Sequence, residues 1–243
     1  MSSERLQKVL SQAGYGSRRE IERWIEQGVL QLNGRIAILG DMVTVTDKIS
    51  LRGKIIENPM RLVKRTRILL YNKPLGEISS RHDPFHQRTV FDKLPILPHG
   101  RWVQVGRLDI NTGGLLVFTN DGELANRLMH PKYEYQREYA VRVFGQVTKE
   151  MLKNLQKGVE LDDGVAKFED IKISGGDNSN AWYHVTLCEG RNRIVRRLWQ
   201  SQGVEVSRLI RIKYGPLQLP RWLNRGQFAE MTPQEVESLM AEL

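Results

Sequence analysis

The chain has 243 residues, of which 40% are hydrophobic, so it can hold one large domain or a small domain joined to a larger one. Lys and Arg total 37 against 28 Asp and Glu, and the resulting charge of +9 favours a polyanionic partner. The opening MSSERLQKVL lacks the apolar core of a signal peptide, and no apolar run reaches the length of a membrane span. We therefore expect a cytoplasmic protein with no membrane partner.

Cysteine and histidine usage argues against disulfide and metal chemistry. Cys188 has no second thiol to pair with, and its strand-like surroundings favour a buried small hydrophobe. His82 and His86 are four residues apart, but Pro84 between them prevents the shared helix face that an H-E-x-x-H metal site needs. The chain also lacks a G-x-x-x-x-G-K-[ST] loop and a G-x-G-x-x-G motif after a strand. We expect no metal and no nucleotide cofactor.

The first 60 residues predict a compact basic module. Apolar residues at helical spacing run from Leu6 to Ala13, and Gly14 can end that helix. Ser17 and Glu20 have the spacing of a capping box, which starts a second helix that Gly28 ends. The pattern then changes to period two, with Asn33-Gly34 as a hairpin turn and further strand-like pieces at residues 43–45 and 49–51.

Two arginines stand directly after the capping serine. Arg18 and Arg19 lie at the positive end of the helix dipole, an arrangement that suits a phosphate ligand. The alternative is a solvated first turn in which Glu20 and Glu22 screen the arginines. The residues alone leave both interpretations open.

The order of helix, SRRE turn, helix and GVLQLNGR hairpin resembles the S4 RNA-binding domain over residues 3–50. The resemblance implies that a set of polar residues in this module faces RNA, namely Lys8, Arg18, Arg19, Asn33 and Arg35.

A basic stretch, NPMRLVKRTR at residues 58–67, has no clean period and is interpreted as a charged linker, which divides the chain into a module at 1–60, a linker at 61–67 and a larger domain at 68–243. Strands are predicted at residues 68–72, 101–105, 115–120, 137–144, 168–173, 182–188 and 207–212. Helices are predicted at residues 123–129, after Thr148, and from the capping box at Thr232. Strands outnumber helices without regular βαβ spacing, so we expect an α+β fold with a mixed, mainly antiparallel sheet.

Residues 105–128 carry the densest chemistry. Arg107 and Asp109 follow a strand-like entry and precede a Gly113-Gly114 turn, which places a carboxylate in a tight loop that a ligand can approach. The alternative is an Asx-type turn in which Asp109 only caps its own loop. Tyr139, on a strand with Val141, either fills the core or stacks on an extruded base.

A second basic segment, residues 190–214, mixes arginines with apolar residues. Arg191, Arg193, Arg196 and Arg197 interleave with Ile194, Val195, Leu198 and Trp199, so at least one guanidinium lies beside the core. A partly buried guanidinium needs an anion, either a carboxylate such as that of Asp109 or a phosphate.

GRLDINTGGLLVFTNDG at residue 106 onward resembles the signature motif of the pseudouridine synthases of the RsuA branch, and NKPLG, REY and EGRNRIVRR match further motifs of that family in order. An S4 domain followed by this catalytic domain is the usual layout of the branch. The fine sequence, such as GELANRLMHP and SRLIRIKYG, is most similar to the members that act on large-subunit ribosomal RNA.

The resemblance implies that Asp109 is the catalytic aspartate, that Tyr139 packs against the target base and that Arg196 pairs with the aspartate. Arg107 then fills the gap left by the flipped uridine, and Arg191 and Arg193 contact RNA. The implied reaction isomerises a uridine in a ribosomal RNA stem-loop, possibly one within an assembling large subunit. It uses no cofactor, and we take a monomer as the default.

Two other functions fit parts of the sequence. A ribosome-assembly factor could keep the S4 domain and a decayed catalytic domain, but Asp109, Tyr139 and Arg196 are all present. A DNA-binding protein could use the helix–turn–helix of residues 3–27, but the Asn33-Gly34 hairpin favours an S4 domain and therefore RNA.

Overall fold

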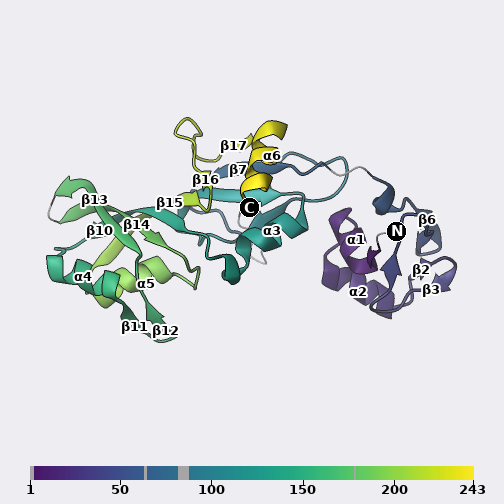
Figure 1. Ribbon diagram of the computed structural model, residues 1–243, viewed down its shortest axis with the longest axis horizontal. Helices are drawn as coiled ribbons and strands as arrows, with labels where there is room; N and C mark the ends of the chain where they lie inside the picture. The colour runs from purple at the N-terminus through teal and green to yellow at the C-terminus, as the bar shows by residue number, and fades with distance from the viewer. Residues whose placement is uncertain (1–2, 63–64, 82–87, 178) are drawn as a thin grey trace. The chain divides into compact units, whose positions relative to one another are not determined.

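The computed structural model describes residues 3–62, 65–81, 88–177 and 179–243 (Figure 1). The contacts divide the chain into two units. The first contains Met1–Arg67, Pro95–Val103 and Asn120–Gly122, and the second contains Ile68–Leu94, Gln104–Thr119 and Glu123–Leu243. His82 and His86, considered above as metal ligands, lie outside the described residues.

The first unit contains two short helices and two small sheets. Its elements are β1 (Glu4–Arg5), α1 (Leu6–Gln12), α2 (Arg18–Glu26), β2 (Leu30–Leu32), β3 (Arg35–Ile36), β4 (Met42–Val43), β5 (Ile49–Leu51), β6 (Lys54–Ile56) and the 3-10 turn η1 (Pro59–Arg61). One sheet has the antiparallel order β3-β2-β5-β6, and β1 pairs with β4. A core of buried aliphatic side chains from both helices and from β2, β4 and β5 holds the unit together.

Local signals determine this unit as the sequence predicts. The Ser17 hydroxyl accepts a hydrogen bond from the Glu20 amide at 3.1 Å, and the Glu20 carboxylate accepts one from the Ser17 amide at 3.3 Å, which completes the capping box. Asn33 and Gly34 both have positive φ, as a two-residue hairpin turn requires.

The basic stretch predicted as a linker makes specific contacts within the first unit. The Asn58 side chain is buried and donates to the carbonyls of Thr44 and Asp47, both at 2.8 Å. Arg61 donates from Nε to the Val45 carbonyl at 2.9 Å, and the Arg67 amide donates to the Asn120 side chain at 2.8 Å. Asn58 and Arg61 thus contact the segment 44–47 of the module, and Arg67 contacts Asn120 of the same unit.

From Ile68 onward the chain forms a large sheet with helices. The elements are β7 (Ile68–Lys73), β8 (Val103–Val105), β9 (Gly113–Thr119), α3 (Gly122–Met129), the 3-10 turn η2 (Pro131–Tyr133), β10 (Arg137–Phe144), α4 (Lys149–Lys157), β11 (Val159–Leu161), β12 (Gly164–Ala166), β13 (Asp170–Asp177), β14 (Asn180–Leu187), α5 (Ile194–Ser201), β15 (Glu205–Tyr214), β16 (Leu217–Gln218), β17 (Phe228–Glu230) and α6 (Pro233–Glu242).

The sheet has the strand order β13-β14-β10-β15-β9-β7-β17, with β16 beside β15 and β8 beside β9. Strands β15 and β9 run parallel, and the other registered neighbours of this order run antiparallel. The expected α+β fold with a mixed, mainly antiparallel sheet is therefore confirmed.

The parallel pair depends on a glycine. Gly114 has φ of 95°, and a Cβ at this position would lie 2.3 Å from the Arg211 carbonyl oxygen. Only a residue without a side chain permits β9 to approach β15 this closely.

Helix α5 and the β11–β12 hairpin are among the elements of this unit that have no counterpart among the predicted ones. Helix α5 begins after Arg193, which has φ of 50° and makes no side-chain capping bond, so the usual start signal is missing. The hairpin β11–β12 turns within a charged segment, and its strands are three residues each. It lies beside α5 (Figure 1).

Candidate active site

A cleft of about 1040 Å³ opens in the second unit. Its walls are the loop before β9, strands β10 and β15, the segment leading into α5, and β12 with the residues after it. Asp109 and Tyr139 line this cleft together, although 30 residues separate them, and Arg107, Arg193 and Arg211 add positive charge. The volume is in the range of ligand-binding pockets and is large enough for a nucleotide.

A buried lysine holds the backbone of the Asp109 loop. Lys73, at the end of β7, has no exposed surface and donates from Nζ to the carbonyls of Asp109 at 3.0 Å, Thr112 at 2.9 Å and Pro74 at 3.1 Å. The three N–H bonds of an ammonium group match these three acceptors. Burial lowers the pKa of Lys73 to about 8, with Glu77 and Asp109 opposing the shift.

Further bonds hold the same loop. The Ser79 hydroxyl donates to the Leu108 carbonyl at 2.8 Å, and the Gly76 amide donates to the Ile110 carbonyl at 2.8 Å. The Thr112 amide donates to the Asp109 carbonyl at 3.0 Å, which closes a turn. This turn uses the Asp109 backbone carbonyl as acceptor, whereas an Asx-type turn would use the side-chain carboxylate, and the Asp109 residue lines the cleft.

The structure places Tyr139 both in the core and at the cleft. It is 8% exposed on the same face of β10 as the buried Val141, and it also lines the cleft. Its cross-strand neighbours are Val185 on β14 and Arg211 on β15.

Arg196 lies near Asp109 without forming the predicted ion pair within the described residues. Its guanidinium donates to the Val206 carbonyl at 2.6 Å and to the Asn111 carbonyl at 2.8 Å. Desolvation by burial and the nearby Arg193 lower the pKa of Arg196, and the charge of Asp109 opposes this. Arg196 thus binds the backbone of the Asp109 loop through the Asn111 carbonyl. Its other Nη group is occupied by the Val206 carbonyl.

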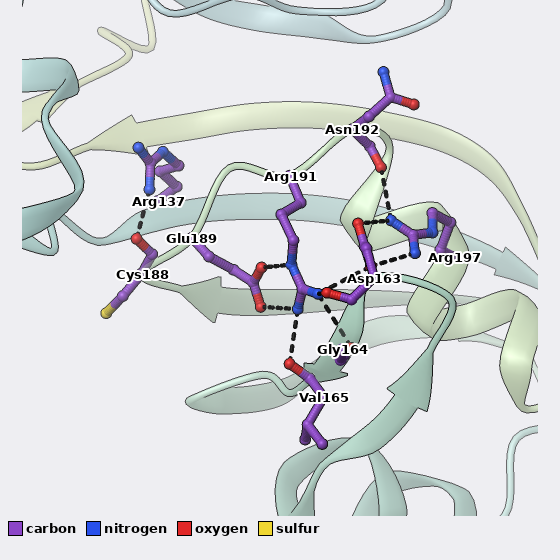
Figure 2. Close-up of polar contacts among 9 residues, drawn as sticks. All are labelled: Arg137, Asp163, Gly164, Val165, Cys188, Glu189, Arg191, Asn192 and Arg197. Carbon is purple, nitrogen blue, oxygen red and sulfur yellow. Dashed lines mark hydrogen bonds and ion pairs between the residues drawn. The ribbon is translucent and has the colours of Figure 1, made fainter.

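Arg191, predicted to contact RNA, is occupied by partners in its own unit (Figure 2). It forms an ion pair with Glu189 through Nε, and its Nη1 lies 2.9 Å from the Asp163 carboxylate. It also donates to the carbonyls of Gly164 at 3.1 Å and Val165 at 2.8 Å. Arg191 thus attaches the β11–β12 hairpin to the loop before α5.

Arg197, in the first turn of α5, adds a second arginine to the Asp163 carboxylate. It donates to both carboxylate oxygens of Asp163, at 2.8 Å and 2.5 Å. The Arg197 hydrogen bond, with the charges of Arg191 and Arg197, lowers the pKa of Asp163 to about 2. By contrast, Arg107 and Arg193 are exposed at the cleft and have no ion pair within the described residues.

The predicted RNA-facing residues of the first unit also divide into two groups. Arg18 and Arg19 are exposed and form no ion pair among the described residues. Lys8 instead pairs with Glu4 at 3.3 Å, Arg35 pairs with Asp41 at 2.7 Å, and the Asn33 amide donates to Asp47 at 2.7 Å. These three contribute to local structure as well as to the polar surface.

The sequence reasoning did not single out Lys73, Thr112 or Arg211. The signal for Arg211 was available, because period two on β15 places it on the same face as the buried Leu209. Its burial at 2% exposure is unusual for a charged residue. Lys73 belongs to the NKPLG motif, but nothing in that motif indicates three backbone acceptors.

Cys188 is half-buried at the cleft rather than fully buried, and desolvation raises the pKa of its thiol. That shift opposes a nucleophilic role. Across the described ranges, no group of three potential metal-ligating His, Cys, Asp or Glu side chains occurs, and no helix has the length and apolar character needed to cross a bilayer.

Comparison with known families assigns the chain to a class of enzyme. The family model of RNA pseudouridylate synthase matches residues 67–201, and the S4 domain model matches residues 4–49. The chain belongs to the RNA pseudouridylate synthase family and carries an S4 domain before its catalytic domain. The enzyme class implied by its motifs is thereby confirmed.

Individual relatives are closely similar. The ribosomal large subunit pseudouridine synthase B of Salmonella typhi is 57% identical over 231 residues, which cover 94% of this chain and 79% of that protein. The protein of the same name from Haemophilus influenzae is 56% identical over 238 residues, covering 97% and 67%. A crystal structure of a pseudouridylate synthase matches with a TM-score of 0.66 at 26% identity, covering 97% of this chain and 99% of that one.

Proposed function

We propose that this chain isomerises a uridine of large-subunit ribosomal RNA to pseudouridine, with Asp109 as the catalytic carboxylate. The observation that carries the proposal is the Asp109 loop, whose backbone is fixed by Lys73 at the edge of a cleft that Tyr139 also lines. The relatives named above support the choice of ribosomal RNA.

The reaction needs no net oxidation or reduction. The bond between N1 of uracil and C1′ of ribose breaks, the base turns within the cleft, and a bond forms between C5 and C1′. The C5 proton leaves to water and N1 gains a proton. Asp109 acts on the ribose, either by attack at C1′ or by removal of the C2′ proton. The base must first leave its helix, since the cleft cannot act on a stacked nucleotide.

The other residues position the substrate. Tyr139 packs against the flipped base, and Arg196 holds the Asp109 loop through the Asn111 carbonyl. Arg107 fills the gap that the uridine leaves in the RNA, and Arg193 at the rim contacts phosphate.

The S4 domain supplies a second contact with the RNA, in which Arg18 and Arg19 face the phosphates of a stem-loop; Lys8, Asn33 and Arg35 are weaker candidates because each has a local partner. We further propose that the enzyme works as a monomer, since one unit of one chain lines the cleft. We also propose a cytoplasmic location, which a ribosomal RNA substrate would support.

Tritium release tests the proposal. Ribosomal RNA carrying tritium at uracil C5 loses that tritium to water when the glycosidic bond moves to C5. We expect release by the wild type and a fall of at least about a thousandfold in Asp109→Asn, with RNA affinity nearly unchanged. Asp170→Asn is the matched control, because that carboxylate pairs only with Lys172 at the surface among the described contacts. Normal turnover by Asp109→Asn would refute the assignment of the catalytic residue.

A non-catalytic assembly factor is the competing function. It would bind stem-loop RNA with the affinity of the wild type and release no tritium from either naked RNA or assembly particles. That pair of results would overturn the proposed activity while leaving the RNA-binding role of the S4 domain intact.

A further inference from the structure

Three of the residues that line the cleft carry a buried polar side-chain atom with no hydrogen-bond partner, namely Gln104, Thr112 and Arg211. Arg211, on β15, is 2% exposed, and its Nη2 is unsatisfied. Thr112, at the end of the Asp109 loop, is also 2% exposed, and its hydroxyl is unsatisfied. Both residues line the cleft that contains Asp109. The parallel register pairs Gly114, two residues after Thr112, with Arg211, so Thr112 directly precedes the strand that neighbours β15.

Among the described residues, the Arg211 guanidinium has one carbonyl acceptor and one aromatic neighbour, and it has no carboxylate partner. Its Nε donates to the Leu115 carbonyl at 2.8 Å, and its guanidinium lies 4.9 Å from the centre of the Tyr214 ring. No carboxylate within ion-pair distance of Arg211 occurs in the described part of the chain. A guanidinium that is buried and left with a free donor costs free energy unless an acceptor arrives with a ligand.

We propose that Arg211 and Thr112 form a subsite that reads the polar edge of the flipped uracil, with Arg211 Nη2 donating to a ring carbonyl oxygen. The inference rests on the proposed function. Uracil presents two carbonyl oxygens separated by the N3–H group, so its edge offers acceptor, donor and acceptor in sequence. Arg211 supplies a donor, and the Thr112 hydroxyl serves as a donor or as an acceptor for N3–H.

The position of Arg211 favours the base over a phosphate. Arg211 is the direct cross-strand neighbour of Tyr139, and directly opposed residues on a sheet project to the same face with Cβ atoms about 5 Å apart. If the base packs on Tyr139, its edge reaches Arg211. A phosphate suits the exposed arginines at the rim better, because it keeps much of its hydration there.

Thiouridine substitution tests the subsite without altering the protein. Sulfur is a poor hydrogen-bond acceptor. A target nucleotide in which sulfur replaces O2 or O4 therefore weakens the hydrogen bond from Arg211 to that position. Tritium release from C5 is measured in single turnovers at saturating enzyme. We expect one of the two thiouridines to react about ten- to a hundredfold more slowly than uridine in the wild type, and that position identifies the carbonyl that Arg211 binds.

The Arg211→Met variant, tested with both uridine and the thiouridine, shows whether the thiouridine penalty depends on Arg211. It should turn over uridine about ten- to a hundredfold more slowly, and the penalty for the thiouridine should disappear, because the donor is already gone. Arg208→Met is the matched control, since Arg208 is exposed on the same strand. It should retain both the wild-type rate and the thiouridine penalty.

Thr112→Val keeps the test decisive if Arg211→Met does not fold, as checked by thermal unfolding. Valine has nearly the shape of threonine, and we expect slower turnover with unchanged RNA affinity. A thiouridine penalty in Arg211→Met as large as in the wild type would overturn the subsite. So would an effect of Arg211→Met confined to RNA affinity and its salt dependence, which would indicate a phosphate contact. Absence of release by the wild type from uridine would instead refute the proposed function.

Discussion

At the scale of single residues, Lys73 gives the active site its shape without facing the substrate. A buried ammonium group with three carbonyl acceptors stabilises one backbone path for the residues around Asp109 and Thr112. Lys73→Met should lower the free energy of unfolding at pH 7 by about 1–3 kcal/mol, because the acceptors remain buried without a donor. Turnover should fall by more than about tenfold as the loop relaxes. Lys149→Met, at an exposed lysine of α4, should change neither.

The pH dependence of unfolding offers an independent check on Lys73. Its pKa is about 8 in the folded chain and near 10.5 in the unfolded chain. Between these values the unfolded state binds more protons, so this residue makes stability rise with pH in that window. Denaturant unfolding of the wild type and Lys73→Met from pH 7 to 10.5 should show a contribution of positive slope only in the wild type. Identical slopes in the two proteins would mean that burial does not lower the pKa of Lys73 in the folded chain.

At the scale of elements, the β11–β12 hairpin is held at the cleft by charge rather than by apolar packing alone. Asp163 accepts hydrogen bonds from Arg197 and Arg191, and Val165 and Ala166 of the same hairpin line the cleft. Asp163→Asn should leave the sheet intact and release the hairpin. We expect faster amide hydrogen exchange over residues 160–165 and no change in β10.

Acid should also speed amide hydrogen exchange in the β11–β12 hairpin of the wild type. The pKa of Asp163 is about 2 in the folded chain, below its ordinary value of 3.8. Its stabilising contribution is therefore present above pH 4 and is lost as the pH falls toward 2. Asp162→Asn, which leaves the Asp163 carboxylate in place, is the matched control. Equal hydrogen exchange in Asp163→Asn and the wild type would show that packing holds the hairpin.

The elements differ in how far the sequence could predict them. The capping boxes at Ser17 and Thr232 and the Asn33-Gly34 turn are local signals, and each produced the expected element. Helix α5 was not predicted, because its first turn is held by groups that are distant in the sequence, such as the Asp163 carboxylate that binds Arg197. The motifs singled out Asp109 and Tyr139, and the structure brings both residues to one cleft, while their roles stay a prediction. The backbone acceptors of Arg196 and the occupied guanidinium of Arg191 depend on tertiary contacts that no local pattern encodes.

At the scale of the whole molecule, the positive charge should govern affinity and leave the chemistry unchanged. Arg18→Ala combined with Arg19→Ala should weaken binding to a ribosomal RNA stem-loop and reduce the slope of log K against log salt by about 1.4–1.8, the value for two lost phosphate contacts. Tritium release at saturating RNA should be unchanged. Lys149→Ala with Lys153→Ala, at exposed positions of α4, removes the same charge elsewhere. Equal changes in salt slope for both double variants would mean that net charge, and not the S4 surface, sets binding.

The place of β15 in the sheet has a consequence for how the protein is made. This strand lies between β10 and β9, yet both are synthesised well before it. Until β15 leaves the ribosome, β7 with β9 and β10 with β14 are separate pieces whose inner edges have no partner, and such edges invite mispairing. The cleft itself does not exist before that moment, because β15 joins the piece that carries Tyr139 to the loop that carries Asp109. A nascent chain still tethered to its ribosome short of this strand is therefore catalytically silent toward the RNA around it.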